Sequence, residues 1–132
     1  MVGSVDYRTK RRGTEAFTHA ASKKLGRSAS EAARELVAVG AGEIFLNSID
    51  RDGTMTGYDL EIIREVALDV DVPVLACGGA GTLADMRAAL AAGASAVAAG
   101  SMFVFHGRHR AVLITYPDRR EIADLMIPPA GA

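Results

Sequence analysis

The feature of this sequence that most constrains its fold is a repeating pattern: a short apolar run, a Gly-rich or polar loop, and then an amphipathic helical segment. This alternation predicts βα units whose strands form a parallel sheet. We expect a short extended piece around Phe17, within the polar stretch Arg8 to Arg27. The runs predicted as strands are Val2 to Tyr7, Ile44 to Ile49, Val74 to Cys77 and Ala96 to Ala99.

Helix starts are marked by residues that can cap the first turn. A Ser, Thr or Asp followed three residues later by an acidic residue is typical of a capping box. Val112 to Tyr116 is apolar and partly β-branched, which favours an extended segment. The predicted helices run from Ser28 to about Val39, from Leu60 to Val70 behind Asp59, from Thr82 to Gly93, and from Asp118 through Met126.

Composition narrows the function classes. The net charge of −1 argues against a nucleic-acid or anionic-membrane partner. The single cysteine, Cys77, permits no disulfide within the chain and favours a reducing, cytoplasmic setting. No apolar stretch is long enough to span a membrane, and no signal peptide is expected. His19, His106 and His109 lack metal-ligand context, so no metal site is expected.

The unusual residues gather where the predicted strands end, which is where ligands bind in parallel βα folds. The glycines of two of these loops, with Ser101, predict a phosphate site, because backbone N–H groups can approach an anion there. Helix N-termini would add positive dipole ends. The strand-end residues are Asp6, Asn47, Asp50, Gly78, Gly79, Gly100 and Ser101.

Each of the other candidates has two readings. Asp6 could act as a general acid or base, or it could cap a loop. Asp50 and Arg51 could pair and fix their turn, while Asp52 and Thr54 face a substrate. Cys77 is expected to be a buried small residue rather than a nucleophile. The cations Arg8, Lys10, Arg11 and Arg12 could be solvated or could attract an anionic substrate.

Four runs of this sequence are specific enough to compare with known families. They are Gly40-Ala41-Gly42-Glu43-Ile44, Ser48-Ile49-Asp50-Arg51-Asp52-Gly53-Thr54, Gly57-Tyr58-Asp59 and Ala76-Cys77-Gly78-Gly79-Ala80-Gly81. With these runs, the chain from Val5 to about Phe103 resembles the cyclase subunit of imidazole glycerol phosphate synthase.

This resemblance implies an α/β fold that is the C-terminal half, strands five to eight, of a (β/α)₈ TIM barrel. Four βα units would occupy residues 1–127, and 128–132 would be a disordered tail. The length of 132 residues is about half of the roughly 250 that such barrels contain.

The resemblance also implies roles for individual residues. Asp6 matches the second of two catalytic aspartates, and Asn47, Asp52 and Thr54 match positions near the substrate. Four further residues match one phosphate site. They are Gly78, Gly79, Gly100 and Ser101.

The activity implied is that of a synthase subunit in histidine biosynthesis. It takes ammonia from a glutaminase partner and forms imidazole glycerol phosphate and aminoimidazole carboxamide ribonucleotide without a cofactor. The stretch Phe103 to Pro117 departs from the usual ending and resembles a branch associated with surface-polysaccharide synthesis, in which ammonia is delivered to a sugar.

The missing first half of the barrel leaves a further alternative, a phosphate-binding half-barrel with no catalysis of its own. Four parallel strands alone would leave two unpaired edges and one uncovered apolar face. We therefore expect the chain to pair with its N-terminal half-barrel or with a second copy in a homodimer.

Overall fold

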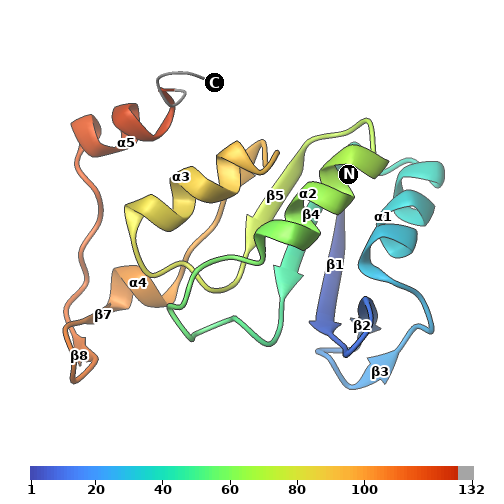
Figure 1. Cartoon of the computed structure of the whole chain (residues 1–132), viewed down its shortest axis with the longest axis horizontal. Helices are drawn as coiled ribbons and strands as arrows, with labels where there is room; N and C mark the ends of the chain where they lie inside the picture. The colour runs from blue at the N-terminus through green and yellow to red at the C-terminus, as the bar shows by residue number, and fades with distance from the viewer. Residues whose placement is uncertain (128–132) are drawn as a thin grey trace.

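A computed structural model describes residues 1–127 of the chain. The predicted tail, 128–132, lies outside the described residues. Figure 1 shows a sheet with helices along one face and a C-terminal arm at one end. None of the helices within residues 1–127 combines the length and apolarity that a membrane crossing requires.

The four predicted strands form the parallel part of one sheet, which confirms the α/β class. They are β1 (Val2–Thr9), β4 (Glu43–Ser48), β5 (Val74–Cys77) and β6 (Ala96–Val97). The order across the sheet is β3-β2-β1-β4-β5-β6, so the four parallel strands are neighbours in chain order. Consecutive parallel strands joined by helices are the repeating unit of an α/β barrel.

Three helices cover one face of this sheet. They are α1 (Ala29–Ala38), α2 (Leu60–Asp69) and α3 (Leu83–Ala91), and α2 packs beside both of the others. Each begins at its predicted N-cap, Ser28, Asp59 or Thr82, whose side chain accepts a hydrogen bond from an amide of the first turn. The core lies between these helices and the sheet, and Ile44, Val66 and Ala76 are fully buried in it.

A hairpin extends one edge of the parallel sheet, so our prediction of two unpaired edges was wrong for Asp6 to Thr9 of β1, whereas Val2 to Val5 have no β2 partner. β2 (Thr14–Thr18) pairs antiparallel with Asp6 to Thr9 of β1, and β3 (Lys23–Lys24) pairs with β2. The turn closes through a 2.9 Å hydrogen bond from Lys10 N to the Gly13 carbonyl. Because β2 also contributes the buried Ala16 to the core, the hairpin is held by packing as well as by its hydrogen bonds.

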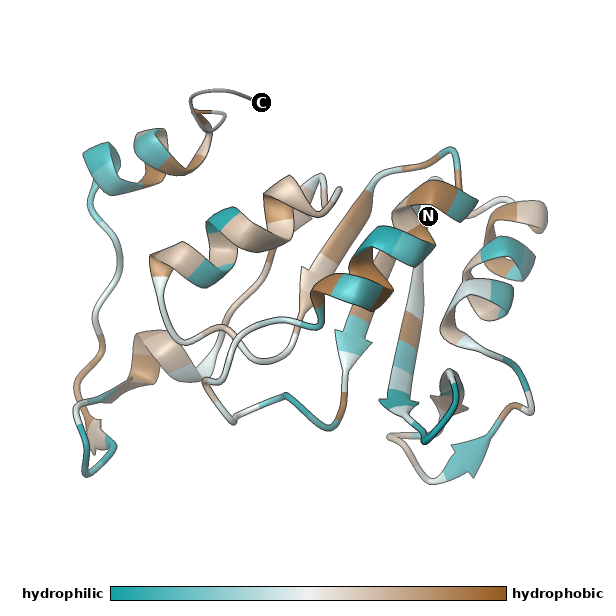
Figure 2. Cartoon of the chain, in the orientation of Figure 1, coloured by the Kyte–Doolittle hydropathy of each residue, from teal (hydrophilic) through white to brown (hydrophobic). Residues whose placement is uncertain are grey.

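The two faces of the sheet have different surroundings. On β1, Gly3, Val5 and Tyr7 are buried under the helices, whereas Asp6 on the other face is half-buried. β4 and β5 alternate in the same way. Figure 2 shows that the tips of β1 and β4 are hydrophilic, while β5 is apolar. The helix-free face therefore carries the polar groups of the strand ends.

The C-terminal region follows the sheet as an arm. A short helix α4 (Ser101–Val104) leads into a two-stranded hairpin of β7 (Phe105–His106) and β8 (Ala111–Val112). The extended conformation predicted for Val112 to Tyr116 is seen as hydrogen bonds from Leu113 N and Thr115 N to carbonyls of α4. The predicted last helix is α5 (Arg119–Leu125), which has the Asp118–Glu121 capping box and packs on α3.

Candidate functional site

Three candidate side chains lie in one row across the strand tips. Asp6 of β1 pairs in register with Asn47 of β4, and Asn47 pairs with Cys77 of β5. Directly paired residues point to the same face of a sheet, so all three project from the face that the helices leave open. Adjacent strands are about 4.8 Å apart, so the row spans roughly 10 Å from Asp6 to Cys77.

Asn47 is bonded to Asp6 within this row. Its Nδ2 donates a 3.0 Å hydrogen bond to Asp6 Oδ1. An ionised carboxylate can only accept, so the amide nitrogen must be the atom that faces it. The other amide atom, Asn47 Oδ1, is buried and has no hydrogen-bond partner among residues 1–127. Burying an acceptor without a partner costs free energy, so the bond from Nδ2 to Asp6 forms while the amide oxygen stays unsatisfied.

A small hollow of about 10 Å³ lies beside this row, at the tips of β5 and β6. That volume is enough for about one water molecule. The structure brings five of the predicted substrate residues together around the hollow and adds four other residues. Its lining is Asp52, Gly53, Cys77, Gly78, Gly79, Ala80, Ala99, Gly100 and Ser101.

Gly78 and Gly79 are required by close packing of the backbone. Both have φ in the left-handed region, +93° and +104°. A Cβ at Gly79 would lie 2.2 Å from the Gly57 carbonyl oxygen, and one at Gly78 would lie 2.6 Å from that of Ser48. Gly57 N also donates a 2.7 Å hydrogen bond to the Gly79 carbonyl. These glycines therefore join two loops, whatever they bind.

The two helices that begin at the hollow differ in what already occupies their N-termini. At α3, Asp85 Oδ2 accepts hydrogen bonds from Gly81 N and Thr82 N, at 3.0 and 2.8 Å. These amides are therefore not free for an external anion. At α4, the N-cap is Gly100, and no side chain within residues 1–127 caps the helix. An anion in the hollow would therefore have to bind to the loop of Gly78 and Gly79 and to the groups at Gly100 and Ser101.

The charged loop after β4 is held differently from the pairing suggested by the sequence. Asp50 does not pair with Arg51. It accepts a 2.9 Å hydrogen bond from Thr9 N and lies 3.7 Å from the Arg8 guanidinium. Arg51 instead donates to the Gly57 carbonyl at 3.2 Å. The sequence alone does not show these contacts, because the partners of Asp50 and Arg51 come alongside the loop only when the chain folds.

Thr54 is a predicted substrate residue that lies outside the lining of the hollow. Its hydroxyl donates a 2.7 Å hydrogen bond to the Arg51 carbonyl and lies 2.8 Å from the Thr56 hydroxyl. The side chain thus stabilises its own loop. Asp52, by contrast, lines the hollow.

Arg110 is not among the residues predicted for this site. It donates a hydrogen bond to the carbonyl of Gly53, which lines the hollow. Its guanidinium lies 5.2 Å from the centre of the Phe105 ring, a cation–π distance. The β7–β8 hairpin is therefore attached to the loop that carries Asp52.

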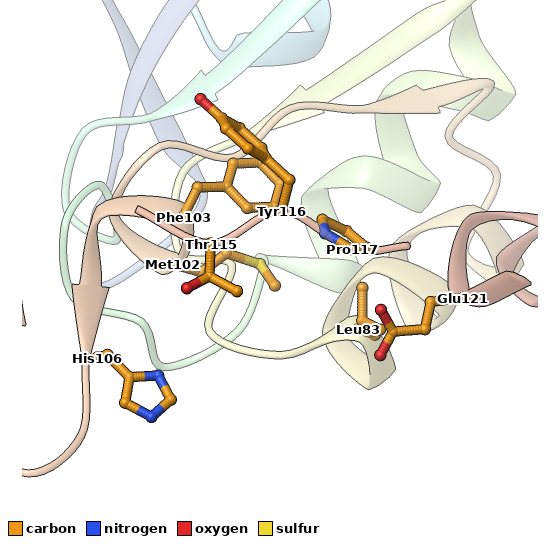
Figure 3. Close-up of a pocket in the computed structure, with 8 residues that line it drawn as sticks. All are labelled: Leu83, Met102, Phe103, His106, Thr115, Tyr116, Pro117 and Glu121. Carbon is orange, nitrogen blue, oxygen red and sulfur yellow. The ribbon is translucent and has the colours of Figure 1, made fainter. Parts of the chain in front are cut away.

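A second cavity, of about 160 Å³, separates the C-terminal arm from the first turn of α3 and from α4. Figure 3 shows the Tyr116 ring close to that of Phe103, and their centres are 5.3 Å apart. His106 and Glu121 also line this cavity. These contacts place the arm against the segment that follows the hollow.

Cys77 lines the hollow, but its thiol is kept protonated. Partial burial raises the pKa of the thiol, and the negative charges of Asp52 and Asp6 raise it further, against a smaller lowering by a hydrogen bond with the Gly78 backbone. A protonated thiol is a weak nucleophile. The electrostatics therefore favour a lining role over covalent chemistry.

Comparison with known proteins gives the family. A family model described as histidine biosynthesis protein matches residues 1–110. A Pseudomonas aeruginosa protein, provisionally named imidazole glycerol phosphate synthase subunit hisF2, is 51% identical over 124 residues, covering 89% of this chain and 48% of that protein. The imidazole glycerol phosphate synthase subunits HisF of Streptomyces griseus and Streptomyces coelicolor are 52% and 50% identical over 106 residues, covering 80% of this chain and 42% of each protein.

The chain spans about half the length of the curated relatives it matches. The matched part contains Asp6, Asn47 and the whole hollow, because each of these lies within residues 1–110. The β8 strand and α5 follow that range. On these similarities, the chain belongs to the histidine biosynthesis protein family, among relatives named as imidazole glycerol phosphate synthase subunits.

Proposed function

We propose that this chain forms strands five to eight of a (β/α)₈-barrel synthase that uses ammonia to make imidazole glycerol phosphate and aminoimidazole carboxamide ribonucleotide. The observation that carries the proposal is that the carboxylate and the hollow lie at the same edge of the sheet. Asp6 is hydrogen-bonded to Asn47 and lies in the same row as Cys77, and Cys77 lines the hollow. A phosphorylated substrate held at the hollow would extend along the strand tips toward Asp6.

In this proposal the hollow binds a phosphoryl group at its mouth, because its volume of about 10 Å³ is too small to enclose one. Gly78, Gly79 and Gly100 would offer backbone amides that no side chain shields, and Ser101 would add a hydroxyl. Asp52 also lines the hollow, and its charge would oppose a dianion unless it faces another part of the substrate. We assign Asp52 to the sugar hydroxyls of the substrate for this reason.

Asp6 would transfer protons during the reaction. Its carboxylate is aimed by Asn47, so it could take a proton from the attacking nitrogen of ammonia, or return one to a departing group. One carboxylate cannot act as general acid and general base at the same time, because it is either protonated or ionised. The second acid–base group would come from the other half of the barrel.

The partners follow from the same proposal. A glutaminase subunit would supply the ammonia, as in a synthase assembled from subunits. The other half-barrel, or a second copy, would pair with the part of β1 that β2 leaves unpaired, Val2 to Val5. Beside that edge lies a groove of about 350 Å³ whose apolar lining includes Phe17, Leu36 and Val39.

The test is a complementation assay. The chain is mixed with the N-terminal half of the Pseudomonas aeruginosa relative, and imidazole formation from ammonia and the aminoimidazole nucleotide is measured. Turnover by the mixture and none by either half is expected. Binding of phosphate by the chain without turnover in any mixture would instead support a non-catalytic half-barrel.

A second candidate is a synthase that delivers ammonia to a sugar in surface-polysaccharide synthesis. The family model ends at residue 110, whereas the structure packs the following arm against α3 and α4 through Tyr116 and Glu121. An added element next to the hollow would change which substrates the site accepts. Turnover of the aminoimidazole nucleotide by the mixed halves would count against this candidate. Transfer of ammonia to a sugar by the mixed halves would support it.

A further inference from the structure

The hairpin at the edge of β1 encloses a cavity that the proposed reaction does not use. Its volume is about 380 Å³, within the usual range for small-molecule sites. Three cationic side chains line it, Arg8, Lys10 and Lys24, together with one carboxylate, Glu15, and the ring of Phe17. These cations can bind an anionic ligand only where the carboxylates of the chain do not already neutralise them.

The cavity opens on the same face of the sheet as Asp6. Asp6 pairs in register with Phe17 of β2, and Phe17 pairs with Lys24 of β3. Arg8 pairs with Glu15, two residues along each strand, so these residues share that face as well. Lys24 stands two strands from Asp6, or roughly 10 Å between their backbones. A ligand reacting at Asp6 could therefore reach the cavity.

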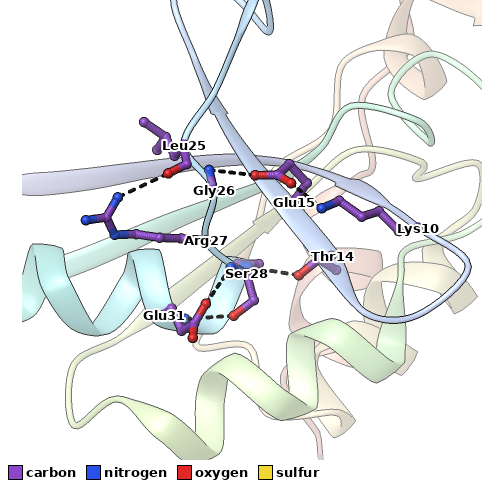
Figure 4. A network of polar contacts seen from close by, with 9 residues as sticks. Lys10, Thr14, Glu15, Leu25, Gly26, Arg27, Ser28 and Glu31 are labelled. Atoms are coloured by element: carbon purple, nitrogen blue, oxygen red, sulfur yellow. Dashed lines mark hydrogen bonds and ion pairs between the residues drawn. The ribbon is translucent and has the colours of Figure 1, made fainter.

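Glu15, the carboxylate in the cavity lining, already accepts hydrogen bonds from other groups of the chain. The Glu15 side chain is only 8% exposed, and it accepts hydrogen bonds from Lys10 Nζ and, at 2.7 Å, from Gly26 N. Figure 4 shows Glu15 held between these two groups. The Lys10 ammonium is the main reason why the pKa of this carboxyl lies below its ordinary value. Glu15 therefore binds Lys10 directly and has a weaker attraction to Lys24, so one carboxylate faces three cations and the cavity keeps an excess of positive charge.

Arg8 and Lys24 carry the charge that remains. Arg8 lies 3.7 Å from Asp50, and its side chain is 50% exposed, which is a loose and weak ion pair. Its guanidinium lies 5.7 Å from the centre of the Phe17 ring, which holds it over the cavity. Lys24 is exposed and forms no ion pair within residues 1–127. The neighbouring Arg11 and Arg12 of the turn add to the positive potential.

We propose that this cavity is a second anion subsite, in which Lys24 and Arg8 bind a phosphoryl or carboxylate group of a sugar-containing substrate. An oxyanion there would lie on the opposite side of Asp6 from the glycine-lined hollow. The inference rests on the proposed function only in placing the reacting part of the ligand at Asp6. Phosphoryl and carboxylate groups share the oxygen acceptors that ammonium and guanidinium donors bind.

The test is a titration of the ¹⁵N-labelled chain, followed by NMR, with inorganic phosphate in one arm and glucuronate in the other. The amides of Lys24 and Gly26 report on the cavity, and those of Gly79 and Ser101 report on the hollow. Lys24→Ala is compared with Lys23→Ala, which removes the same charge from the adjacent residue. Because Lys23 pairs with Thr18, it points to the other face of the hairpin, so it is a matched control.

Lys24→Ala should weaken anion binding at the cavity about tenfold, which corresponds to the loss of one charge-assisted hydrogen bond. It should leave the response at the hollow unchanged, and Lys23→Ala should change cavity binding by no more than about twofold. The anion that binds more tightly, phosphate or glucuronate, identifies the group as phosphoryl or carboxylate.

Two results would overturn the subsite: no response of the cavity amides to either anion, or equal weakening by both lysine variants. A cavity response without a hollow response would support the subsite and remove the basis of the proposed function. The reverse pattern would remove the subsite and leave the hollow in place.

Discussion

The side-chain amide of Asn47 donates a 3.0 Å hydrogen bond to the carboxylate of Asp6 across two parallel strands. The bond fixes the direction of the carboxylate, and both groups lie on the face that the helices leave open. In the proposed function, this carboxylate would transfer protons to a ligand at the strand tips.

Asp6→Asn should abolish most synthase activity in the complementation assay and leave phosphate binding intact. Loss of a general acid or base lowers the rate by about a hundredfold or more, and the amide is nearly isosteric with the carboxylate. The control is Asp71→Asn, an exposed position between α2 and β5. Retained activity in the Asp6 variant would assign this residue a loop-capping role.

Gly79→Ala should destabilise the fold strongly, because its Cβ would overlap the Gly57 carbonyl oxygen at 2.2 Å. Gly40→Ala is a matched control, since Gly40 has the same φ of +104° and a Cβ there would meet nothing within 4 Å among the described residues. The control should cost about 1 kcal/mol of unfolding free energy, and Gly79→Ala should cost at least about 3 kcal/mol.

Urea unfolding of the two glycine variants measures this difference directly. Equal losses in both variants would mean that the left-handed backbone alone requires glycine at position 79. The packing of the two loops would then not explain the residue.

Cys77 should react slowly with iodoacetamide at neutral pH, with half-maximal reactivity above the pH of about 8.5 that is typical of a free thiol. Burial and the carboxylates of Asp52 and Asp6 disfavour the thiolate, so its pKa is raised and the reactive form appears only as the pH increases. Asp52→Asn removes one negative charge, and its alkylation profile should therefore move to lower pH. A profile that does not move would show that the charge of Asp52 does not contribute to the raised pKa of the thiol.

Arg110→Ala should loosen the loop that carries Asp52, because it removes the donor to the Gly53 carbonyl and the contact with Phe105. Faster hydrogen exchange in residues 51–57 is expected, with a severalfold loss of phosphate affinity at the hollow. Arg108→Ala, in the same hairpin, is the control. If both variants exchange alike, the hairpin does not hold this loop through Arg110.

The isolated chain should self-associate through the part of β1 that the hairpin leaves unpaired, Val2 to Val5. Val39 is 74% exposed and lines the groove beside this edge, so Val39→Asp should weaken association in sedimentation experiments. Leu68→Asp serves as the control, because Leu68 is 80% exposed but lies on α2, away from the groove. A compact monomer at low concentration would contradict this expectation.

The sequence by itself determined the parallel strands, their helices and the N-caps. These features depend on local periodicity and on contacts three residues apart, as at Ser28 with Glu31 and Thr82 with Asp85. It also indicated which loops carry the candidate site, because in a parallel sheet every strand ends at the same edge.

Only the tertiary structure decided which of these residues meet. It paired Asp50 with Arg8 rather than Arg51, placed Thr54 outside the hollow, and brought Arg110 to Gly53 from 57 residues away. It also placed Lys24 on the face of Asp6, through the register of a hairpin that the sequence marked only around Phe17. Side-chain contacts between distant segments depend on register and packing, and no local pattern encodes either of them.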